Sequence, residues 1–139
     1  MCYAAYMSTP SSSQMGYIPG VCNIGPAEII LRKRAGWVFA AATLLAAWAL
    51  HHFHARPDTA LVIFFPATIS SVGFLQAYLH FCVKFGMQGL FNVSASELRT
   101  ESVDQTEWRK KDKRKAQMII VGSFLIGILL TIGVYLSLH

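Results

Sequence analysis

The chain has 139 residues, of which 54% are hydrophobic and only 14% are charged, and its formal net charge is +5. Soluble domains usually carry about 25% charged residues, so this composition indicates a membrane protein. Each bilayer crossing takes about 20 residues, which excludes a large globular enzyme in a chain of this length. The basic residues lie beside apolar segments, so we expect contact with anionic lipid or a partner rather than with nucleic acid.

The N-terminal part of the chain predicts an irregular tail followed by a short helix. Residues 1–25 are rich in Ser, Tyr and Gly and lack the basic and apolar regions of a signal peptide. Pro26 suits the first position of a helix, and residues 26–34 predict a short amphipathic helix at the membrane interface. Its end carries three basic residues that we expect to contact lipid headgroups or a partner: Arg32, Lys33 and Arg34.

The next segment predicts the first transmembrane helix. Residues 35–53 contain no Asp, Glu, Lys or Arg, and Trp37 and Trp48 lie near the two ends, as in an aromatic belt. Gly36 and Ala40 are four residues apart, so they share a helix face that a neighbouring backbone can approach closely. We therefore predict helix packing at these two small residues.

A second transmembrane helix is predicted over residues 60–83, with a continuation along the interface to about residue 91. The whole stretch would be longer than a hydrocarbon core of about 30 Å, so its end must leave the bilayer or bend. Four polar residues recur at steps of four and are expected on one slowly turning helix face: Gln76, His80, Lys84 and Gln88.

Residues 92–115 predict a basic, water-exposed loop that continues into an extension of the next helix. Its basic residues are candidates for contact with lipid or a partner, and they are Arg109, Lys110, Lys111, Lys113, Arg114 and Lys115. Residues 116–138 carry no charge and predict the third transmembrane helix. Ser123, Gly127 and Thr131 recur every four residues within it and form a packing face of small residues.

These elements predict an all-α integral membrane protein with three transmembrane helices and one short interfacial helix. Cytoplasmic loops are enriched in Lys and Arg, so the N-terminus and residues 92–115 are expected in the cytoplasm and the C-terminus outside. We therefore expect a multi-pass protein of the inner (plasma) membrane.

Histidines supply the candidate ligands for a cofactor or a metal. An ionisable residue in a membrane segment is a candidate for function, so His80, with Gln76 one turn before it, could hold haem or quinone. However, His80 is expected near the inner interface, where hydrogen bonding to headgroups or protein is the simpler role. His51 and His54 have a spacing that allows a shared metal, although a solvated helix end explains them as well.

Cys22 and Cys82 are expected on the cytoplasmic side, where they can meet as a thiol pair. Reducing conditions there disfavour a stable disulfide, and a free Cys is often only a small buried hydrophobic residue. The sequence contains no glycine-rich phosphate loop, no Ser-His-Asp set and no paired carboxylates. We therefore favour a protein that is not an enzyme, with no cofactor as the first expectation.

Two segments of the sequence are similar to parts of other proteins. They are CNIGPAEI at residues 22–29, which leads into a basic cluster, and GFLQAYLHFCVKFG at residues 73–86. These segments resemble uncharacterised small bacterial inner-membrane proteins. The resemblance implies a bacterial inner-membrane origin and implies no activity.

The packing faces favour a small accessory or structural subunit of a larger membrane complex, or a homo-oligomer, without catalysis of its own. Packing of the three helices on one another is the simpler interpretation of the same faces. The alternative is a small membrane redox protein that binds haem or quinone at His80 or uses the thiols of Cys22 and Cys82. A transporter-like unit built from several copies is a third hypothesis.

Overall fold

The computed structural model describes residues 17–92 and 101–139 of the chain, and it is mostly helical. The elements follow in the order α1 (Pro26–His52), the 3-10 helix η2 (Pro57–Ile63), α2 (Phe64–Tyr78), α3 (Val83–Gln88), β1 (Leu90–Phe91), β2 (Glu101–Ser102) and α4 (Thr106–Ser137). Three helical segments among the described residues are long and apolar enough to cross a membrane: α1, η2 together with α2, and α4. The predicted helical class with three apolar segments of spanning length is confirmed.

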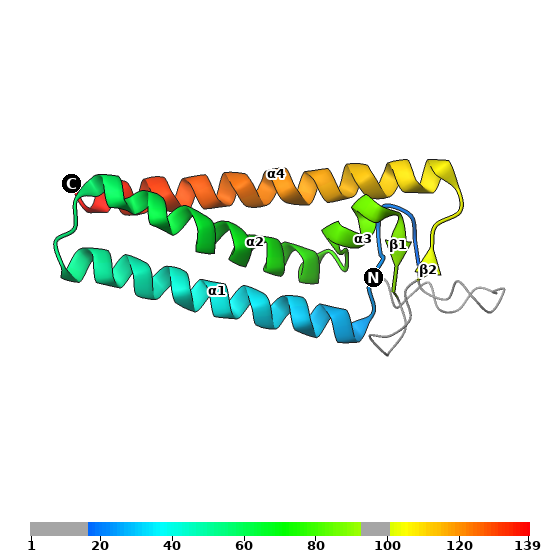
Figure 1. The fold of residues 1–139 in the computed structure, drawn as a ribbon, viewed down its shortest axis with the longest axis horizontal. Coiled ribbons are helices and arrows are strands. Elements are labelled where there is room, and N and C mark those ends of the chain that lie inside the picture. Colours follow the sequence, from blue (N-terminus) through cyan, green and yellow to red (C-terminus); the bar gives the residue numbers. More distant parts are fainter. Residues whose placement is uncertain (1–16, 93–100) are drawn as a thin grey trace.

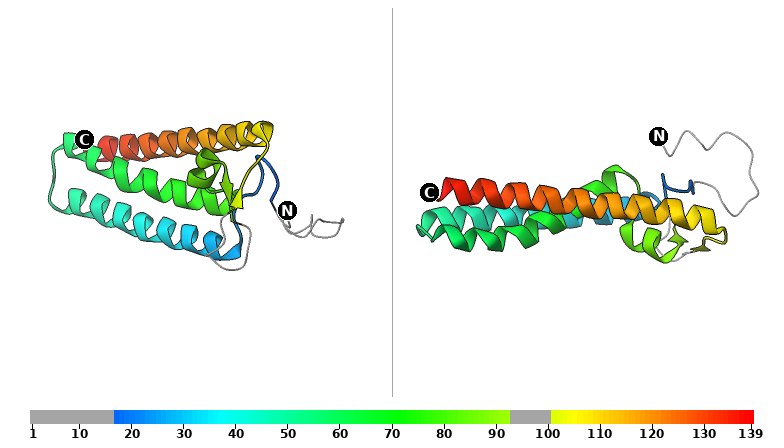
Figure 2. Two further views of the ribbon diagram at one scale, coloured as in Figure 1. Left: turned by 45° about the vertical axis from the view of Figure 1, so that its right-hand side comes forward. Right: turned by 90° about the horizontal axis from the view of Figure 1, so that it is seen from above.

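The three long segments lie side by side in one layer, with α2 between α1 and α4 (Figure 1). Seen from above, the layer is thin, and no fourth long helix from residues 17–92 or 101–139 covers it (Figure 2). Large apolar side chains therefore remain exposed on the outer helices, for example Trp37 and Trp48 on α1 and Leu129 on α4. Such surfaces need lipid or another protein to cover them.

α1 and α2 come close because glycines face each other across their contact. A Cβ atom added to Gly73 would lie 2.8 Å from the backbone nitrogen of Gly36, so only glycine fits there. The Ser70 hydroxyl donates a hydrogen bond of 2.9 Å to the Gly36 carbonyl, which links the two helices directly. Gly36 is buried at this contact, while Ala40 is half-buried. Gly36, one of the two small residues predicted to pack, therefore packs on α2.

The buried face of α4 runs along most of its length at steps of three or four residues. Its members are Asp112, Ala116, Ile119, Ser123, Gly127 and Thr131. A Cβ atom added to Gly127 would overlap the Thr68 hydroxyl of α2, so the predicted stripe of small residues faces α2. These residues pack within the chain, which is the simpler of the two interpretations of the stripe.

α1 and α4 each continue without a break from a polar part into an apolar part. α1 continues through the predicted junction after residue 34, because no Gly-Pro turn or other helix breaker separates the lead-in from the apolar segment. α4 begins at Thr106, ten residues before the apolar segment, so residues 106–115 are all helical and form the predicted extension of this helix. The basic residues of this stretch are therefore fixed on helix faces.

The second span ends earlier than the sequence predicts. α2 stops at Tyr78 rather than residue 83, and the Phe81 amide donates back to the Gln76 carbonyl at 3.0 Å. His80 has a φ of 54°, the left-handed conformation that ends many helices. This turn buries Phe81 completely, which offsets the loss of helical hydrogen bonds. The expected continuous polar face of Gln76, His80, Lys84 and Gln88 is therefore wrong, because the helix breaks within it.

One end of the layer carries a small cap (Figure 1). It consists of residues 17–25, the turn 79–82, α3, the β1–β2 pair and the first turns of α4. The strands are antiparallel, with Leu90 opposite Ser102. An apolar cluster beneath them contains Tyr17, Phe91 and Val103, with Trp108 against it. The cap thus has a core of its own outside the three apolar spans.

Candidate functional site

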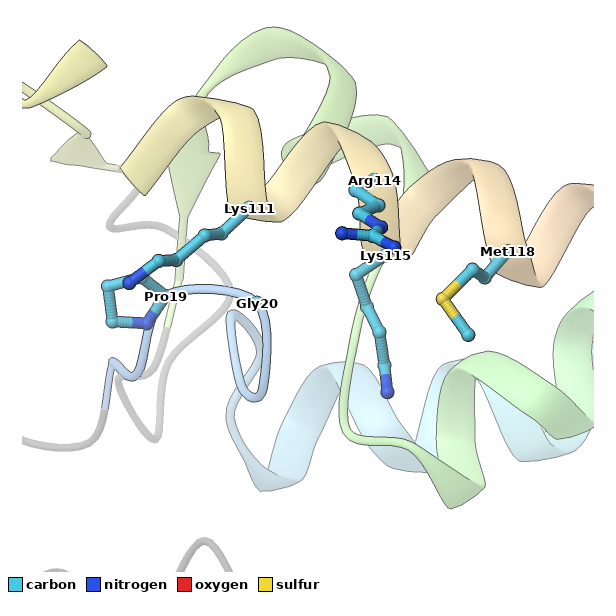
Figure 3. Close-up of a pocket in the computed structure, with 6 residues that line it drawn as sticks. All are labelled: Pro19, Gly20, Lys111, Arg114, Lys115 and Met118. Carbon is cyan, nitrogen blue, oxygen red and sulfur yellow. The ribbon is translucent and has the colours of Figure 1, made fainter. Parts of the chain in front are cut away.

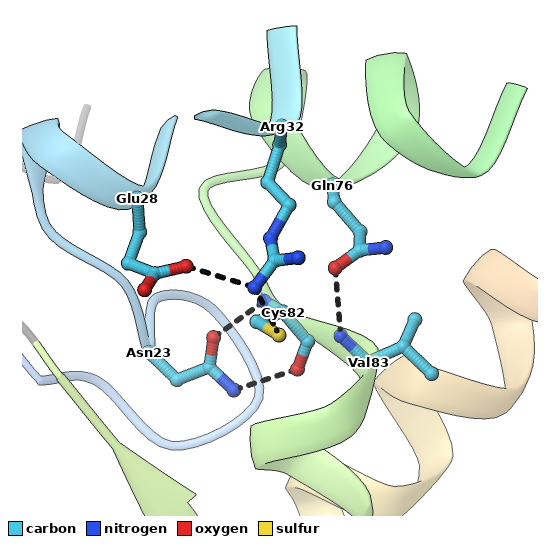
Figure 4. Close-up of polar contacts among 6 residues, drawn as sticks. All are labelled: Asn23, Glu28, Arg32, Gln76, Cys82 and Val83. Atoms are coloured by element: carbon cyan, nitrogen blue, oxygen red, sulfur yellow. Dashed lines mark hydrogen bonds and ion pairs between the residues drawn. The ribbon is translucent and has the colours of Figure 1, made fainter. Parts of the chain in front are cut away.

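A buried asparagine holds the cap to the end of α2 (Figure 4). The Asn23 side chain accepts a hydrogen bond from the Cys82 amide at 2.6 Å and donates one to the Cys82 carbonyl at 3.1 Å. Its own amide donates to the His80 carbonyl, and its carbonyl accepts from the Asn92 amide. Asn23 is fully buried, so these bonds replace all its contact with water. The residue joins three segments that are far apart in sequence.

Arg32 lies beside this asparagine, and its side chain is partly buried. Its Nη2 atom is 2.8 Å from the Glu28 carboxylate and 3.4 Å from the Cys82 sulfur (Figure 4). Its Nε atom is buried without a hydrogen-bond partner among the described residues. Lys33 and Arg34 are exposed, as a lipid or partner contact requires. Of the three basic residues predicted to contact lipid headgroups or a partner, Arg32 is the one whose guanidinium bonds within the protein.

The predicted thiol pair is not joined by a disulfide. Cys82 carries a free thiol and is buried, and Cys22 is buried in the same part of the cap. The neighbour of Cys22, Asn23, contacts the Cys82 backbone, so the topology does bring the two segments together. The segments 22–29 and 73–86 therefore meet at this point of the fold.

Gln76 caps α3. Its side-chain oxygen accepts a hydrogen bond of 3.2 Å from the Val83 amide, which is at the first position of that helix (Figure 4). His80 is half-buried, and its carbonyl is used by Asn23. The structure therefore gives Gln76 and the His80 backbone structural contacts in the turn after α2.

A fully buried carboxylate stands within the basic run of α4. Asp112 accepts hydrogen bonds from the Tyr17 hydroxyl at 2.7 Å and from the Gly20 amide at 2.6 Å. Burial raises the pKa of Asp112, and the two hydrogen bonds offset part of that shift. Burial and the nearby carboxylate likewise raise the pKa of Tyr17. We name this contact the Asp112 latch, because it holds residues 17–20 against α4.

The latch forms one wall of an open pocket of about 320 Å³ (Figure 3). The pocket is lined by Pro19, Gly20, Lys111, Arg114, Lys115 and Met118. Three cationic side chains thus come from adjacent turns of one helix. Among the described residues, ion pairs are found only for Arg32 with Glu28 and for Arg56 with Asp58. The pocket cations are therefore not neutralised by the described part of the chain.

The histidines predicted as metal ligands lie at the opposite end of the layer. The His51 Nε2 atom is 3.0 Å from the Ser137 hydroxyl, so it contacts the end of α4. His54 is exposed and lies in the turn before η2. Within residues 17–92 and 101–139, no group of three or more His, Cys, Asp or Glu side chains is placed to hold a metal ion.

Sequence reasoning missed both Asn23 and Asp112 as structural centres. Asp112 is four residues before Ala116, so it continues the buried face of α4, and that spacing was the available signal. Asn23 offered no such signal, because it is used by a turn that follows the unexpected end of α2.

Comparison with protein families, curated proteins and solved structures finds no match for the chain.

Proposed function

We propose that the chain is a small, non-catalytic membrane subunit that assembles laterally with other membrane proteins or with further copies of itself. The observation that carries this proposal is the open layer of helices. α1 is described in full, and Gly36 is its one buried residue. The helix contacts α2 along a narrow face and leaves the rest of its surface for lipid or protein.

The outer face of α1 alternates small and large side chains, as helix-packing surfaces do. Ala41 is exposed between Trp37 and the pair Leu45 and Trp48, so a small residue is flanked by large ones. In membranes, such small residues allow a neighbouring helix to approach closely, whereas lipid tails gain little from them. This pattern supports a protein partner on that face.

The proposed placement is a bacterial inner membrane, with the cap in the cytoplasm. The cap carries the basic stretch 109–115, the adjoining start of α1 carries residues 32–34, and the opposite end of the layer carries Arg56 with His51 and His54. This distribution supports the orientation by the excess of Lys and Arg in cytoplasmic segments. The resemblance of residues 22–29 and 73–86 to bacterial membrane proteins supports the same origin.

The proposal is tested by the mass of the protein in mild detergent. We expect a mass above that of one 15.4 kDa chain plus detergent, from added copies or foreign subunits. Ala41→Leu fills the gap on the outer face of α1 and is expected to reduce the assembled fraction. Gly133→Leu is the control, because nothing lies within 4 Å of a Cβ at this position on the other edge of the layer.

Two results would overturn the proposal. One is a mass in detergent that corresponds to a single wild-type chain, together with chemical cross-linking in the membrane that also yields only single chains. The other is a Soret or quinone absorbance near one per chain that His80→Ala abolishes, which supports the redox alternative.

A further inference from the structure

The pocket beside Gly20 lies where the polar part of α4 meets its apolar part. Lys115 is the last charged residue before the apolar segment, which starts at Ala116. Met118 also lines the pocket, and it is 64% exposed. A ligand in this pocket therefore meets cations at one end and an apolar side chain at the other (Figure 3).

The cations of the pocket share one helix face. Arg114 and Lys115 follow Lys111 by three and four residues, so the three side chains start from one face of adjacent helix turns. Arg offers a planar fork of donors that matches phosphate oxygens, and Lys adds a compact positive charge. The only acid within this stretch, Asp112, is turned inward and fully buried. The pocket therefore favours an anion with several oxygens.

The latch gives the pocket a fixed second wall. Gly20 has a φ of 73°, and a Cβ added to it would lie 3.2 Å from the Lys111 Cβ. The loop thus lies directly on the helix at the first of the three cations. Because Asp112 accepts the Gly20 amide, the buried carboxylate holds this wall in position.

We propose that this pocket binds the phosphate of an anionic phospholipid, with Lys111, Arg114 and Lys115 around the phosphate and Met118 against the glycerol or the start of the acyl chains. The inference rests on the proposed membrane placement and is independent of the proposed lateral assembly. A free phosphate ion has the same binding chemistry but makes no use of Met118, and the experiment separates the two sources.

The test is native mass spectrometry of the purified full chain in mild detergent, titrated with phosphatidylglycerol, phosphatidylcholine or inorganic phosphate. We expect a one-to-one adduct with phosphatidylglycerol that is stronger than the phosphatidylcholine adduct and resists millimolar phosphate. The triple variant K111Q/R114Q/K115Q is expected to weaken the phosphatidylglycerol adduct on the order of 10-fold to 100-fold.

The matched control is K33Q/K110Q/K113Q, which removes the same three charges from exposed positions outside the pocket. It is expected to stay within about twofold of the wild type, because only a diffuse electrostatic contribution is lost. Helix content by circular dichroism shows whether both variants fold. The oligomeric mass is read in the same spectra, so a failure of lateral assembly is seen separately from a failure of lipid binding.

Three results would overturn the inference. Equal losses in the two triple variants would show attraction by net charge without a site. No loss in either folded variant would place the lipid elsewhere. Displacement of phosphatidylglycerol by inorganic phosphate, with phosphate itself bound as tightly, would assign the pocket to the free ion and exclude the lipid.

Discussion

The carboxylate of Asp112 accepts a hydrogen bond from the hydroxyl of Tyr17, 95 residues earlier in the chain. Tyr17 also stacks on Phe91, with ring centroids 4.4 Å apart. One residue therefore ties the start of the described chain both to α4 and to the strand pair. The cap is closed by this long-range contact, and its geometry leads to predictions about stability.

Removing the Asp112 side chain is expected to destabilise the cap. Asp112→Ala leaves the Tyr17 hydroxyl and the Gly20 amide without their partner, at a cost of about 2 kcal/mol or more. Asp112→Asn should cost much less, because its oxygen can accept from Gly20 while its amide donates to the Tyr17 oxygen. Thermal unfolding in detergent, followed by tryptophan fluorescence, measures both. Equal midpoints for Asp112→Ala and the wild type would contradict the latch.

The latch is also expected to depend on pH. The pKa of Asp112 is raised in the folded state above its ordinary value of 3.8, so the folded protein holds the proton more tightly than the unfolded chain. Its contribution to stability is therefore greatest below that ordinary value and is lost as the pH rises through the folded pKa. The thermal midpoint of the wild type relative to that of Asp112→Asn should therefore rise as the pH is lowered. A difference that does not change with pH would contradict this prediction.

Asn23 is expected to be the most sensitive polar residue at the end of α2. Asn23→Ala leaves the Cys82 amide unpaired in a buried place, while the Cys82 carbonyl keeps its bond from the Gly86 amide, so the expected cost is about 1–3 kcal/mol. Asn23→Asp keeps the acceptor for the amide but places a carboxylate oxygen against the Cys82 carbonyl in a buried place, so it should also destabilise the cap. Hydrogen exchange at Cys82 reports the change directly. Gln117→Ala, at an exposed position of α4, is the control and should leave that exchange rate unchanged.

The sequence predicts the three spans because their signal is local. Long uncharged segments must satisfy their backbone groups as helices in a membrane, whatever surrounds them. The stripe of Ser123, Gly127 and Thr131 is readable for the same reason, since helical spacing alone places these residues on one face. That this stripe packs on α2 of the same chain could not be predicted, because it depends on how the helices are arranged.

The cap could not be predicted in this way, because its elements are held by contacts between distant segments. The apolar residues after Tyr78 would permit a longer helix, and what ends it is the burial of Phe81 together with Asn23 from another part of the chain. Arg32 belongs to a basic run, yet Glu28 and the approach of Cys82 turn it inward. Residues 1–16 of the predicted tail and residues 93–100 of the predicted basic loop lie outside the described residues.

The contact between Gly36 and Gly73 makes a prediction about the spacing of α1 and α2. Gly73→Ala places a methyl group against the backbone of α1, which cannot move aside like a side chain, so we expect a loss of about 1–3 kcal/mol. Gly133→Ala is the matched control, because its Cβ meets nothing within 4 Å and alanine favours the helix by up to about 1 kcal/mol. Thermal midpoints in the same detergent compare them. A neutral Gly73→Ala would show that the two helices do not approach this closely.

Two substitutions of His80 distinguish a structural role of this histidine from the redox alternative. Its left-handed conformation is strained for a residue with a Cβ atom, so His80→Gly is expected to stabilise the fold by about 0.5–1 kcal/mol. His80→Ala keeps the strain and should bring no gain. Both variants remove the imidazole, so a cofactor bound by this ring would be lost equally from the two, with a loss of absorbance and of stability. A higher midpoint for His80→Gly alone, with an unchanged spectrum, is the result expected if His80 serves to end α2.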